Sequence, residues 1–467
     1  MAASQGRPAR RRPAAAVADP EPPRGYVVDE QGRRYELGAE IGAGTQGAVH
    51  RVLGHSLAVK LRRTSGVDRA AVEERVRAVR RLDLSGVHIA RPVALLRPPR
   101  LGYVMELMED MQPLSALIPG SGCPATREGY LAGGGLRRRL RLLARCAAAL
   151  ARLHGKGLVY GDLSATNVLV STSPGHDEVQ LIDPDNLRYW SEPLQIHTQP
   201  FAAPELASGR SGVTTLTDAH AFAVAAFWVL RGIHPFNGDA VVGGGSDVEA
   251  RAFAGEFPWV DDPTDDSNAT TRGLPADVVL SPLLRDLAQR TFGPGRTTPE
   301  LRPGVAEWAD RLHAAADATV ECAGCGSTFF LTADECPWCD ARVPPFILAR
   351  FHLFDPEGDG ERTPPRLAVR VVGRDVPVRL EGRDVGTWGA ADADDPRLEL
   401  FWNGSVLLVK ALDGRRYGAA SAGRPLEVGD SEVAIEVRRG AAGTRIHLGP
   451  EDRVHRVLSF ELRQSLP

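Results

Sequence analysis

Residues 159–170 read Val-Tyr-Gly-Asp-Leu-Ser-Ala-Thr-Asn-Val-Leu-Val, and residues 181–183 read Leu-Ile-Asp. Asp162, Asn167 and Asp183 therefore form an oxygen-rich set, and oxygen atoms are the ligands that hard magnesium ions prefer. A carboxylate such as Asp162 can orient an attacking hydroxyl and accept its proton, while Asn167 and Asp183 hold metal against phosphates. Asp and Asn are also common in turns, so their spacing and their neighbours must support this interpretation.

A glycine-rich stretch precedes this set, with the sequence Ile41-Gly42-Ala43-Gly44-Thr45-Gln46-Gly47-Ala48-Val49. Glycines let backbone N–H groups approach phosphates closely, because no Cβ stands in the way. Alone, such a hairpin is more often an ordinary turn. A dinucleotide-binding motif is disfavoured, because the residues after the last glycine have the pattern of strands and not of a helix.

A lysine ends the next apolar run, Leu57-Ala58-Val59-Lys60. An unpaired ammonium is costly to bury, so a phosphate and a carboxylate are its expected partners. The carboxylate is expected from the helix predicted over residues 68–82, where Glu73 and Glu74 are adjacent. Helical geometry turns only one of them inward. Glu74 is the preferred candidate and Glu73 the alternative; the remaining interpretation is that both are solvent charges.

These motifs together resemble the eukaryotic-like protein kinases of bacteria over about residues 26–314. Further matches follow in the family's order. Ala203-Pro204-Glu205 resembles the motif that ends the activation segment, and Asp218 resembles the aspartate that anchors the catalytic loop. His234-Pro235-Phe236 resembles the motif after the next helix, and Arg302-Pro303 resembles the late arginine that pairs with the glutamate of the activation-segment motif. The resemblance therefore implies a Glu205–Arg302 ion pair. It also places Met105-Glu106-Leu107-Met108 at the hinge that holds adenine.

The resemblance implies a two-lobed kinase-like fold that uses ATP and magnesium, or manganese, to phosphorylate Ser or Thr of a protein. The implied catalytic residues are Asp162, Lys60, Asn167, Asp183 and Glu74, with Asn167 and Asp183 as magnesium ligands. The implied ATP-binding residues are Ile41, Gly42, Gly44, Gly47, Val49, Ala58, Lys60, Glu106 and Met108. Ser191 and Thr198 are hydroxyls of the activation segment and candidates for autophosphorylation.

The chain departs from the family at three places. Tyr160-Gly161-Asp162 replaces His-Arg-Asp, so the arginine that grips a phosphorylated activation loop is missing. Ser164 stands where the family has a lysine that contacts the transferring phosphoryl group, which removes one positive charge from the transition state. Asp183-Pro184-Asp185 replaces Asp-Phe-Gly, and proline stiffens this segment.

These departures keep two alternatives open. A pseudokinase scaffold, acting through the C-terminal modules, is favoured by the altered motifs and disfavoured by the intact set Lys60, Asp162, Asn167 and Asp183. A small-molecule kinase is favoured by Ser164. Such enzymes typically lack the Ala-Pro-Glu, His-Pro-Phe and late Arg-Pro motifs, so a protein substrate is preferred.

Two Cys-x-x-Cys pairs follow, Cys322 with Cys325 and Cys336 with Cys339. Four thiolates at this spacing can close tetrahedrally on zinc, and a redox dithiol pair is the alternative. The pattern predicts a structural zinc ribbon over residues 316–344. Thiols used in this way suit a reducing cytoplasm better than a disulfide framework.

After Pro344 the pattern changes to short alternating runs separated by Gly, Asp and Pro, which predicts an all-β sandwich over residues 345–467. The predicted strands are Leu367–Val372, Val376–Leu380, Leu398–Trp402, Ser405–Ala411, Glu432–Val437 and Arg445–Leu448. Its end loosely resembles forkhead-associated domains, without their phosphothreonine-binding signatures, and a generic binding sandwich is the alternative. Either form could recruit an adaptor partner or dock on the kinase.

The whole chain is therefore expected to be an α+β protein with a disordered tail (1–24), a kinase-like domain (25–315), the ribbon and the sandwich. Residues 136–153 repeat apolar residues at helical spacing and have a predicted basic outer face at Arg137–Arg139. A net charge of −3 and an aromatic content of 6% do not indicate nucleic-acid binding. No apolar run reaches the length of a membrane span, and a cytoplasmic protein is expected.

Overall fold

The computed structural model describes residues 25–44, 47–64, 68–120, 122–123, 126–190, 198–358, 360–362, 369–386, 393–421, 424–437 and 443–463. The predicted disordered tail and Ser191 lie outside the described residues. Helices and strands are mixed, which confirms the α+β prediction. The chain divides into two compact units. The first contains the described residues up to Leu82 and residues 91–109, and the second contains residues 83–90 and everything described from Asp110 onward.

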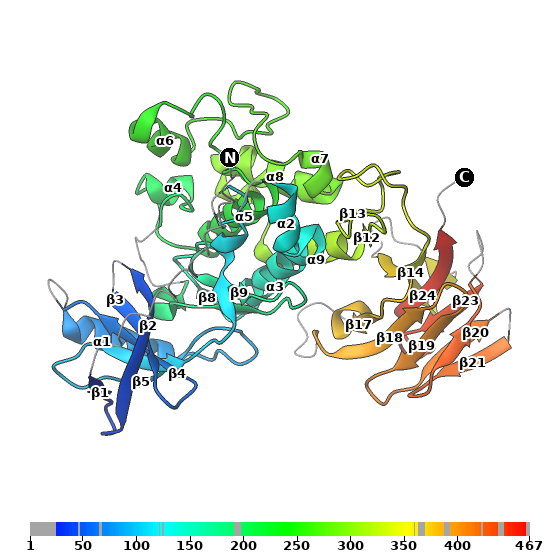
Figure 1. The fold of residues 1–467 in the computed structure, drawn as a ribbon, viewed down its shortest axis with the longest axis horizontal. Helices are drawn as coiled ribbons and strands as arrows, with labels where there is room; N and C mark the ends of the chain where they lie inside the picture. The colour runs from blue at the N-terminus through cyan, green and yellow to red at the C-terminus, as the bar shows by residue number, and fades with distance from the viewer. Residues whose placement is uncertain are drawn as a thin grey trace, which may run out of the picture. The chain divides into compact units, whose positions relative to one another are not determined.

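The first unit is an antiparallel sheet with one long helix against it (Figure 1). Its elements are β1 (Tyr26–Val28), β2 (Arg34–Gly44), β3 (Gly47–Val52), β4 (Leu57–Arg62), α1 (Arg69–Arg81), β5 (Pro92–Leu95) and β6 (Gly102–Glu106), and the sheet order is β1-β2-β3-β4-β6-β5. The Asp68 side chain caps the start of α1 by accepting backbone N–H groups. Val76 of α1 packs with Leu95 and Tyr103 of the sheet, which fixes the helix on one face.

The second unit begins with a mainly helical part. Its elements are β7 (Met111–Pro113), α2 (Arg127–Ala132), α3 (Gly135–Gly155), β8 (Leu158–Val159), β9 (Val168–Ser171), β10 (Val179–Leu181), β11 (Arg188–Tyr189), α4 (Pro204–Ala207), α5 (Thr215–Arg231), α6 (Gly245–Phe253), α7 (Ala276–Val279), α8 (Pro282–Phe292) and α9 (Val305–Asp317). Helix α3 packs against α5 and α9. Strands β10-β9-β7 form one small sheet and β11-β8 another.

The prediction of a basic outer face on helix α3 is wrong for two of the three predicted arginines. Arg138 and Arg139 do not form an outer face, because both are buried and Arg139 is 0% exposed. Arg138 donates to the backbone carbonyl of Ser171, and Arg139 donates to that of Tyr130 at 2.8 Å. Segments distant in sequence cover this side of the helix, and the local helical pattern could not indicate them.

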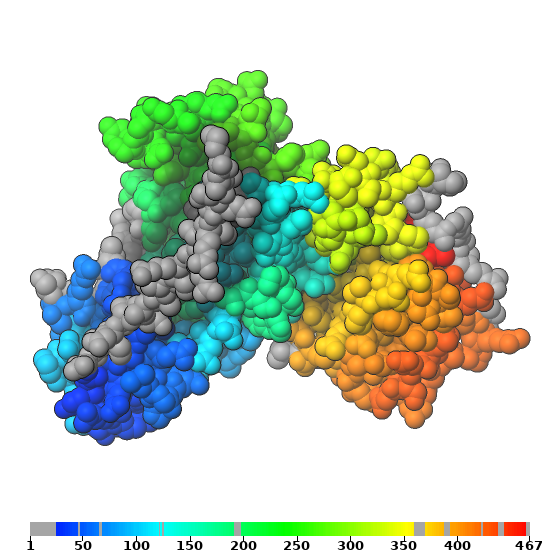
Figure 2. Space-filling model, in the orientation of Figure 1, coloured from blue at the N-terminus to red at the C-terminus, as the bar shows by residue number. Residues whose placement is uncertain are grey.

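The rest of the second unit consists of strands and one short helix. The cysteine-rich segment holds the hairpin β12 (Thr319–Glu321) and β13 (Thr328–Phe330). The β domain, residues 346–463, holds β14 (Phe346–Asp355), β15 (Gly360–Arg362), β16 (Val369–Gly373), β17 (Val378–Glu381), α10 (Gly382–Val385), β18 (Pro396–Trp402), β19 (Leu407–Ala411), β20 (Tyr417–Ser421), β21 (Arg424–Val428), β22 (Val433–Ile435), β23 (Thr444–His447) and β24 (His455–Arg463). Five of the six predicted strands are present with shifted ends; the sixth, predicted over Leu367–Val372, is present from Val369, and residues 367–368 lie outside the described residues. Figure 2 shows the described atoms of the β domain, coloured from yellow through orange to red, packed together.

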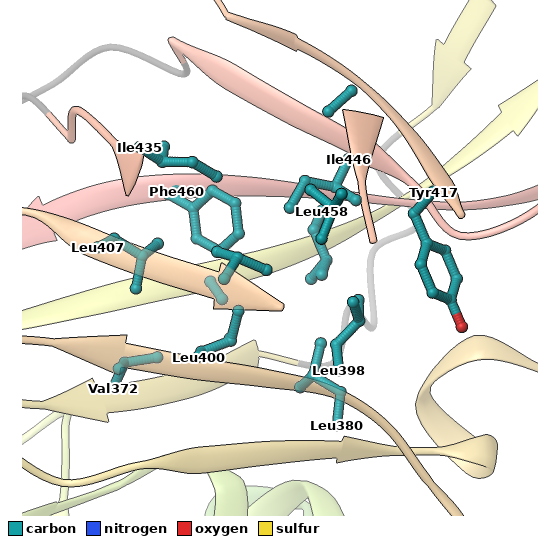
Figure 3. Packing of buried hydrophobic residues seen from close by; sticks show 14 of the residues in the cluster. Val372, Leu380, Leu398, Leu400, Leu407, Tyr417, Ile435, Ile446, Leu458 and Phe460 are labelled. Atoms are coloured by element: carbon teal, nitrogen blue, oxygen red, sulfur yellow. The ribbon is translucent and has the colours of Figure 1, made fainter. Parts of the chain in front are cut away.

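The β domain has two sheets around one apolar core. One sheet has the order β15-β14-β24-β23-β20-β21 with β16 also paired to β14, and the other has the order β17-β18-β19-β22. Figure 3 shows side chains from both sheets pointing toward one another. Leu398, Leu400 and Leu407 from the second sheet meet Leu458 and Phe460 from the first, and all are buried. Alternation of inward apolar residues along each strand builds this core.

Candidate functional site

The loop that holds Asp162 is fixed from below by Asp218 of helix α5. The Asp218 carboxylate is buried and accepts the backbone N–H of Tyr160 at 2.7 Å and that of Gly161 at 2.9 Å. His154, in the last turn of α3, lies 3.0 Å from the same carboxylate. The predicted anchoring role of Asp218 is confirmed. His154 was missed; a titratable side chain at the end of an apolar helix next to this loop was the available signal.

Tyr160 and Gly161 explain how the chain accommodates its altered motif. The Tyr160 hydroxyl donates to the backbone carbonyl of Ile182, the residue before Asp183. Burial raises the pKa of Tyr160 well above its ordinary value, so the hydroxyl keeps its proton and remains a donor. Gly161 has φ of 86°, a left-handed conformation that costs glycine little and other residues more.

Asp162, Asn167 and Asp183 belong to backbone segments that are directly connected. The Asn167 side-chain amide donates to the Asp162 carbonyl at 2.9 Å, which leaves its own carbonyl oxygen free to turn toward a ligand. The Ile182 N–H donates to the Asn167 carbonyl at 3.0 Å. Asp183 has φ of 57°, a left-handed conformation for a non-glycine residue, and such strain clusters at functional sites. These contacts hold three oxygen-bearing side chains on one small framework.

The Asp162 carboxylate already accepts a hydrogen bond from a side-chain hydroxyl. Thr198 donates its side-chain O–H to Asp162 Oδ1 at 2.6 Å, within the range that a proton acceptor needs. A pocket beside this contact is lined by Asp162, Thr198, Phe201, Ala203 and Leu206, among others. The lining also includes Thr217 and Asp218, so two carboxylates and two hydroxyls share it with apolar side chains.

The predicted Glu205–Arg302 ion pair is confirmed. Arg302 donates to both Glu205 carboxylate oxygens, at 2.6 and 2.7 Å, and both residues are buried. Arg302 also donates to the Gly295 carbonyl at 2.7 Å. Bidentate geometry makes this a strong pair and ties α4 to the chain before α9.

The predicted ATP-binding residues lie together in the first unit. Ile41, Gly42 and Gly44 are on β2, Gly47 and Val49 on β3, Ala58 and Lys60 on β4, Glu106 ends β6, and Met108 follows it. Thr45 and Gln46, between the glycines, lie outside the described residues. Lys60 is cross-strand from Val49 and only 7% exposed. Its ammonium lies 5.8 Å from the centre of the Tyr103 ring.

The glycines of this hairpin differ in whether the surrounding protein leaves room for a side chain. A Cβ at Gly47 would lie 1.9 Å from the Leu61 carbonyl oxygen, so packing alone demands glycine there. A Cβ at Gly42 or Gly44 would meet nothing within 4 Å. Protein packing therefore does not explain these two glycines, and close approach of a ligand to the backbone would.

The two candidate glutamates are both on α1 and both pair with arginines of that helix. The Glu74 carboxylate is 63% exposed and lies 3.6 Å from Arg81, so it is on the outer side of the helix. Glu73 is 20% exposed and lies 3.0 Å from Arg69 and from Arg77. This arrangement does not support the preference for Glu74, because an exposed carboxylate does not reach a buried lysine. Pairing of Lys60 with a helix glutamate stays a prediction.

The four cysteines meet in the second unit, where their sulfur atoms all lie within 4.8 Å of one another. Cys322 and Cys339 are 3.5 Å apart, and Cys325 and Cys336 are 3.7 Å apart. Tetrahedral zinc with Zn–S distances of about 2.3 Å places its sulfurs about 3.8 Å apart, so the cluster fits zinc.

Both cysteine pairs have the same turn after them. The Gly326 N–H donates to the Cys322 carbonyl and the Asp340 N–H to the Cys336 carbonyl, each at 2.9 Å. Gly326 and Asp340 both have positive φ, 70° and 58°. Two equivalent knuckles therefore face one metal-sized space, which is the geometry of a structural site with no open position.

Part of the chain is similar to serine/threonine-protein kinases, although no family model matches it. Serine/threonine-protein kinase pkn2 of Myxococcus xanthus is 29% identical over 222 residues, which are 44% of this chain and 25% of that protein. DNA damage-responsive serine/threonine-protein kinase RqkA of Deinococcus radiodurans is 30% identical over 220 residues, 44% of this chain and 31% of that protein. Serine/threonine-protein kinase kin-29 of Caenorhabditis elegans is 26% identical over 219 residues, which are 44% of this chain and 25% of that protein.

The chain spans between a quarter and a third of the length of these curated relatives. The similarity is to proteins that are named serine/threonine-protein kinases, and it covers less than half of this chain. None of the helices in the described part of the chain combines the length and the apolar character that a membrane span requires.

Proposed function

We propose that this chain is a protein kinase that transfers the terminal phosphate of ATP to Ser or Thr hydroxyls of a protein, with magnesium or manganese. In this proposal residues 25–315 form the two-lobed kinase domain, residues 316–344 a zinc ribbon and residues 345–467 a β sandwich. Asp162, Lys60, Asn167 and Asp183 form the catalytic set. The similar proteins are all serine/threonine-protein kinases by name, which supports the reaction class.

One observation carries the proposal: the Asp162 carboxylate, on a loop held by Asp218, accepts a bond from a threonine hydroxyl at 2.6 Å. A protein acceptor brings the same chemical group. The carboxylate would orient that hydroxyl and take its proton as the hydroxyl oxygen attacks phosphorus.

The other residues have separable roles in this mechanism. Magnesium, held by Asn167 and Asp183, would neutralise phosphate charge. Lys60, nearly buried on β4, would bind phosphate oxygens, while Gly42 and Gly44 leave the backbone open to them. The Ala58 strand and the Glu106–Met108 segment would hold adenine. Ser164, which bonds Thr166 at 2.9 Å, supplies no cation, so slow transfer is expected.

A protein acceptor is preferred over a metabolite because the chain contains Ala203-Pro204-Glu205, His234-Pro235-Phe236 and Arg302-Pro303, three motifs that small-molecule kinases typically lack. Labelled ATP offered with a generic acceptor protein and with a metabolite extract separates the classes. Label recovered as phosphoserine or phosphothreonine supports the proposal. Label on metabolites alone indicates a small-molecule kinase, and absence of label with bound nucleotide indicates the pseudokinase scaffold.

Thr198 gives a prediction about the acceptor position. Thr198→Val keeps the shape of the side chain but removes the hydroxyl that orients Asp162 through Oδ1, while Oδ2 of the same carboxylate would receive the acceptor hydroxyl. Transfer to protein should therefore fall about 10- to 100-fold, the value of a hydrogen bond to a charged group. Thr198→Ser keeps the hydroxyl and should retain most activity. Initial rates with a fixed acceptor protein measure both. Faster transfer by Thr198→Val would show instead that this hydroxyl blocks the acceptor position.

The cysteine cluster gives a second prediction. Purified protein should contain one zinc per chain, and Cys336→Ser should lose it and unfold the ribbon, because the metal supplies the folding energy of such small modules. Elemental analysis and thermal unfolding measure this. Cys146→Ser, at a buried helix cysteine outside the cluster, is the control and should keep the zinc. Free thiol ligands need a reducing compartment, so the proposal also places the protein in the cytoplasm.

A further inference from the structure

The β domain has an acidic loop end, formed by Glu381, helix α10 and Asp394. Within it, Asp384 accepts from Arg370 of β16 at 2.6 Å and is nearly fully buried. Burial alone would raise the pKa of Asp384, and the guanidinium groups of Arg370 and Arg383 overcome this, so its pKa lies below the ordinary value. The loop end therefore contains a buried ion pair between Arg370 and Asp384.

This buried ion pair is completed by a residue from outside the β domain. Asp317, the last residue of α9, pairs with Arg370 and lies 3.4 Å from Arg383. Asp317 is 6% exposed and Arg370 3%. Removing any member would leave a buried charge without its full set of partners, which is strongly unfavourable.

Asp317 is also poorly placed for its own helix. An anion at a helix C-terminus faces the negative end of the helix dipole and destabilises the helix. The two arginines of the β domain offset this cost. The position of Asp317 is thus unfavourable for an isolated α9 and favourable only with the β domain in contact.

Helix α3 offers complementary charge to the same loop end. Arg152 lies 2.9 Å from Asp394, and Arg145, two turns earlier on the helix, lies 3.7 Å from Glu381. These pairs are only partly buried, so each contributes modestly to affinity and more to the orientation of the two surfaces. A basic helix face meets an acidic loop end.

The cysteine-rich segment fastens the other end of α3. Arg137 donates to the Thr319 side chain at 2.7 Å and to the Thr319 carbonyl at 2.8 Å. Trp338, between the cysteines of the second knuckle, stacks on Tyr130 of α2 with ring centres 5.6 Å apart. The opposite ends of α3 therefore contact two different C-terminal modules.

We infer that this loop end of the β domain, which carries both carboxylates and arginines, is a docking surface for Arg145 and Arg152 of α3 and for Asp317 at the end of α9. These contacts hold the β domain fixed against the helical part of the second unit. The loop end is then occupied by this chain, and an outside partner of the β domain would bind elsewhere on it. The inference does not depend on phosphate transfer, since it concerns only the contacts within the second unit.

Hydrogen–deuterium exchange on the full chain tests this. In Asp317→Asn, amides of residues 380–385 and of the last turn of α9 should exchange on the order of 100-fold faster, because Arg370 and Arg383 lose their anion. Asp310→Asn, on the same helix with its side chain 46% exposed, is the matched control and should change nothing. Equal exchange in the two variants would overturn the inference.

A charge swap tests the inference again if Asp317→Asn does not fold. Arg152→Glu and Asp394→Arg should each speed exchange of residues 380–385 several-fold, and the double variant should restore protection. Single variants that exchange like the wild type, or a double variant no better than the singles, would show that the β domain is not held through this surface.

Discussion

Asparagine in place of Asp162 is expected to lower phosphate transfer about 10²- to 10⁴-fold while nucleotide affinity stays unchanged. The amide keeps the shape of the side chain and its place on the loop, which Asp218 holds through backbone N–H groups of the preceding residues. It cannot accept the acceptor proton as a carboxylate does. Single-turnover transfer and nucleotide binding, measured on the same preparation, separate the two effects.

The control is Asp286→Asn, at an exposed position on α8. It should transfer phosphate like the wild type. If Asp162→Asn transferred as fast as this control, Asp162 would not be the proton acceptor, and the role assigned to it would be wrong.

Replacing Arg302 with leucine is expected to reduce the free energy of unfolding by about 3–5 kcal/mol, because it leaves the buried Glu205 carboxylate without its bidentate partner. Adding Glu205→Gln should recover part of the loss, since the uncompensated charge disappears. Denaturant unfolding of the wild type, the two single variants and the double variant gives the coupling energy.

A surface pair provides the comparison. Arg251 and Glu256 lie 2.7 Å apart but are both exposed, so Arg251→Leu should cost at most about 1 kcal/mol. A loss in Arg302→Leu no larger than this would show that the Glu205–Arg302 pair does not stabilise the fold.

The confirmed predictions came either from local spacing or from motifs that the family resemblance supplied. The four cysteines meet because each of the two equally spaced pairs forms a tight turn, and the two turns bring all four sulfurs within 4.8 Å of one another. Asp218 and the Glu205–Arg302 pair were expected from the resemblance, and the structure explains them by buried donors that need an acceptor. The identities of the ATP-binding and magnesium-binding residues stay predictions, although their backbone positions suit those roles.

The strand β14 shows why other elements were missed. Phe346 and Leu348 face the core of the cysteine-rich segment, while Ile347 and Ala349 face the core of the β domain. A strand buried on both sides has no polar alternation, so its sequence lacks the periodic signal that predicted strands such as β18. The absence of polar alternation over residues 346–349 of β14 is explained by the two cores that pack on its opposite faces, one in the cysteine-rich segment and one in the β domain.

Long-range pairs account for the remaining differences. Nothing near Asp317 in the sequence indicates its contact with Arg370, because 53 residues separate them and their meeting depends on the complete β domain. The same holds for Arg138, whose partner Ser171 is 33 residues away on β9. The role of Glu74 stays a prediction; α1 buries Val76 and Val79 against the sheet and leaves the Glu74 side chain exposed.

Incorporation of labelled terminal phosphate from ATP into a generic acceptor protein, by the wild type and by Asp183→Ala, tests the proposed function most directly. Each protein is assayed with magnesium, with manganese and without metal. The proposal predicts phosphoserine or phosphothreonine with the wild type only when a metal is present, and none with Asp183→Ala. No label from the folded wild type with either metal would contradict it and would leave a scaffold that has lost the reaction.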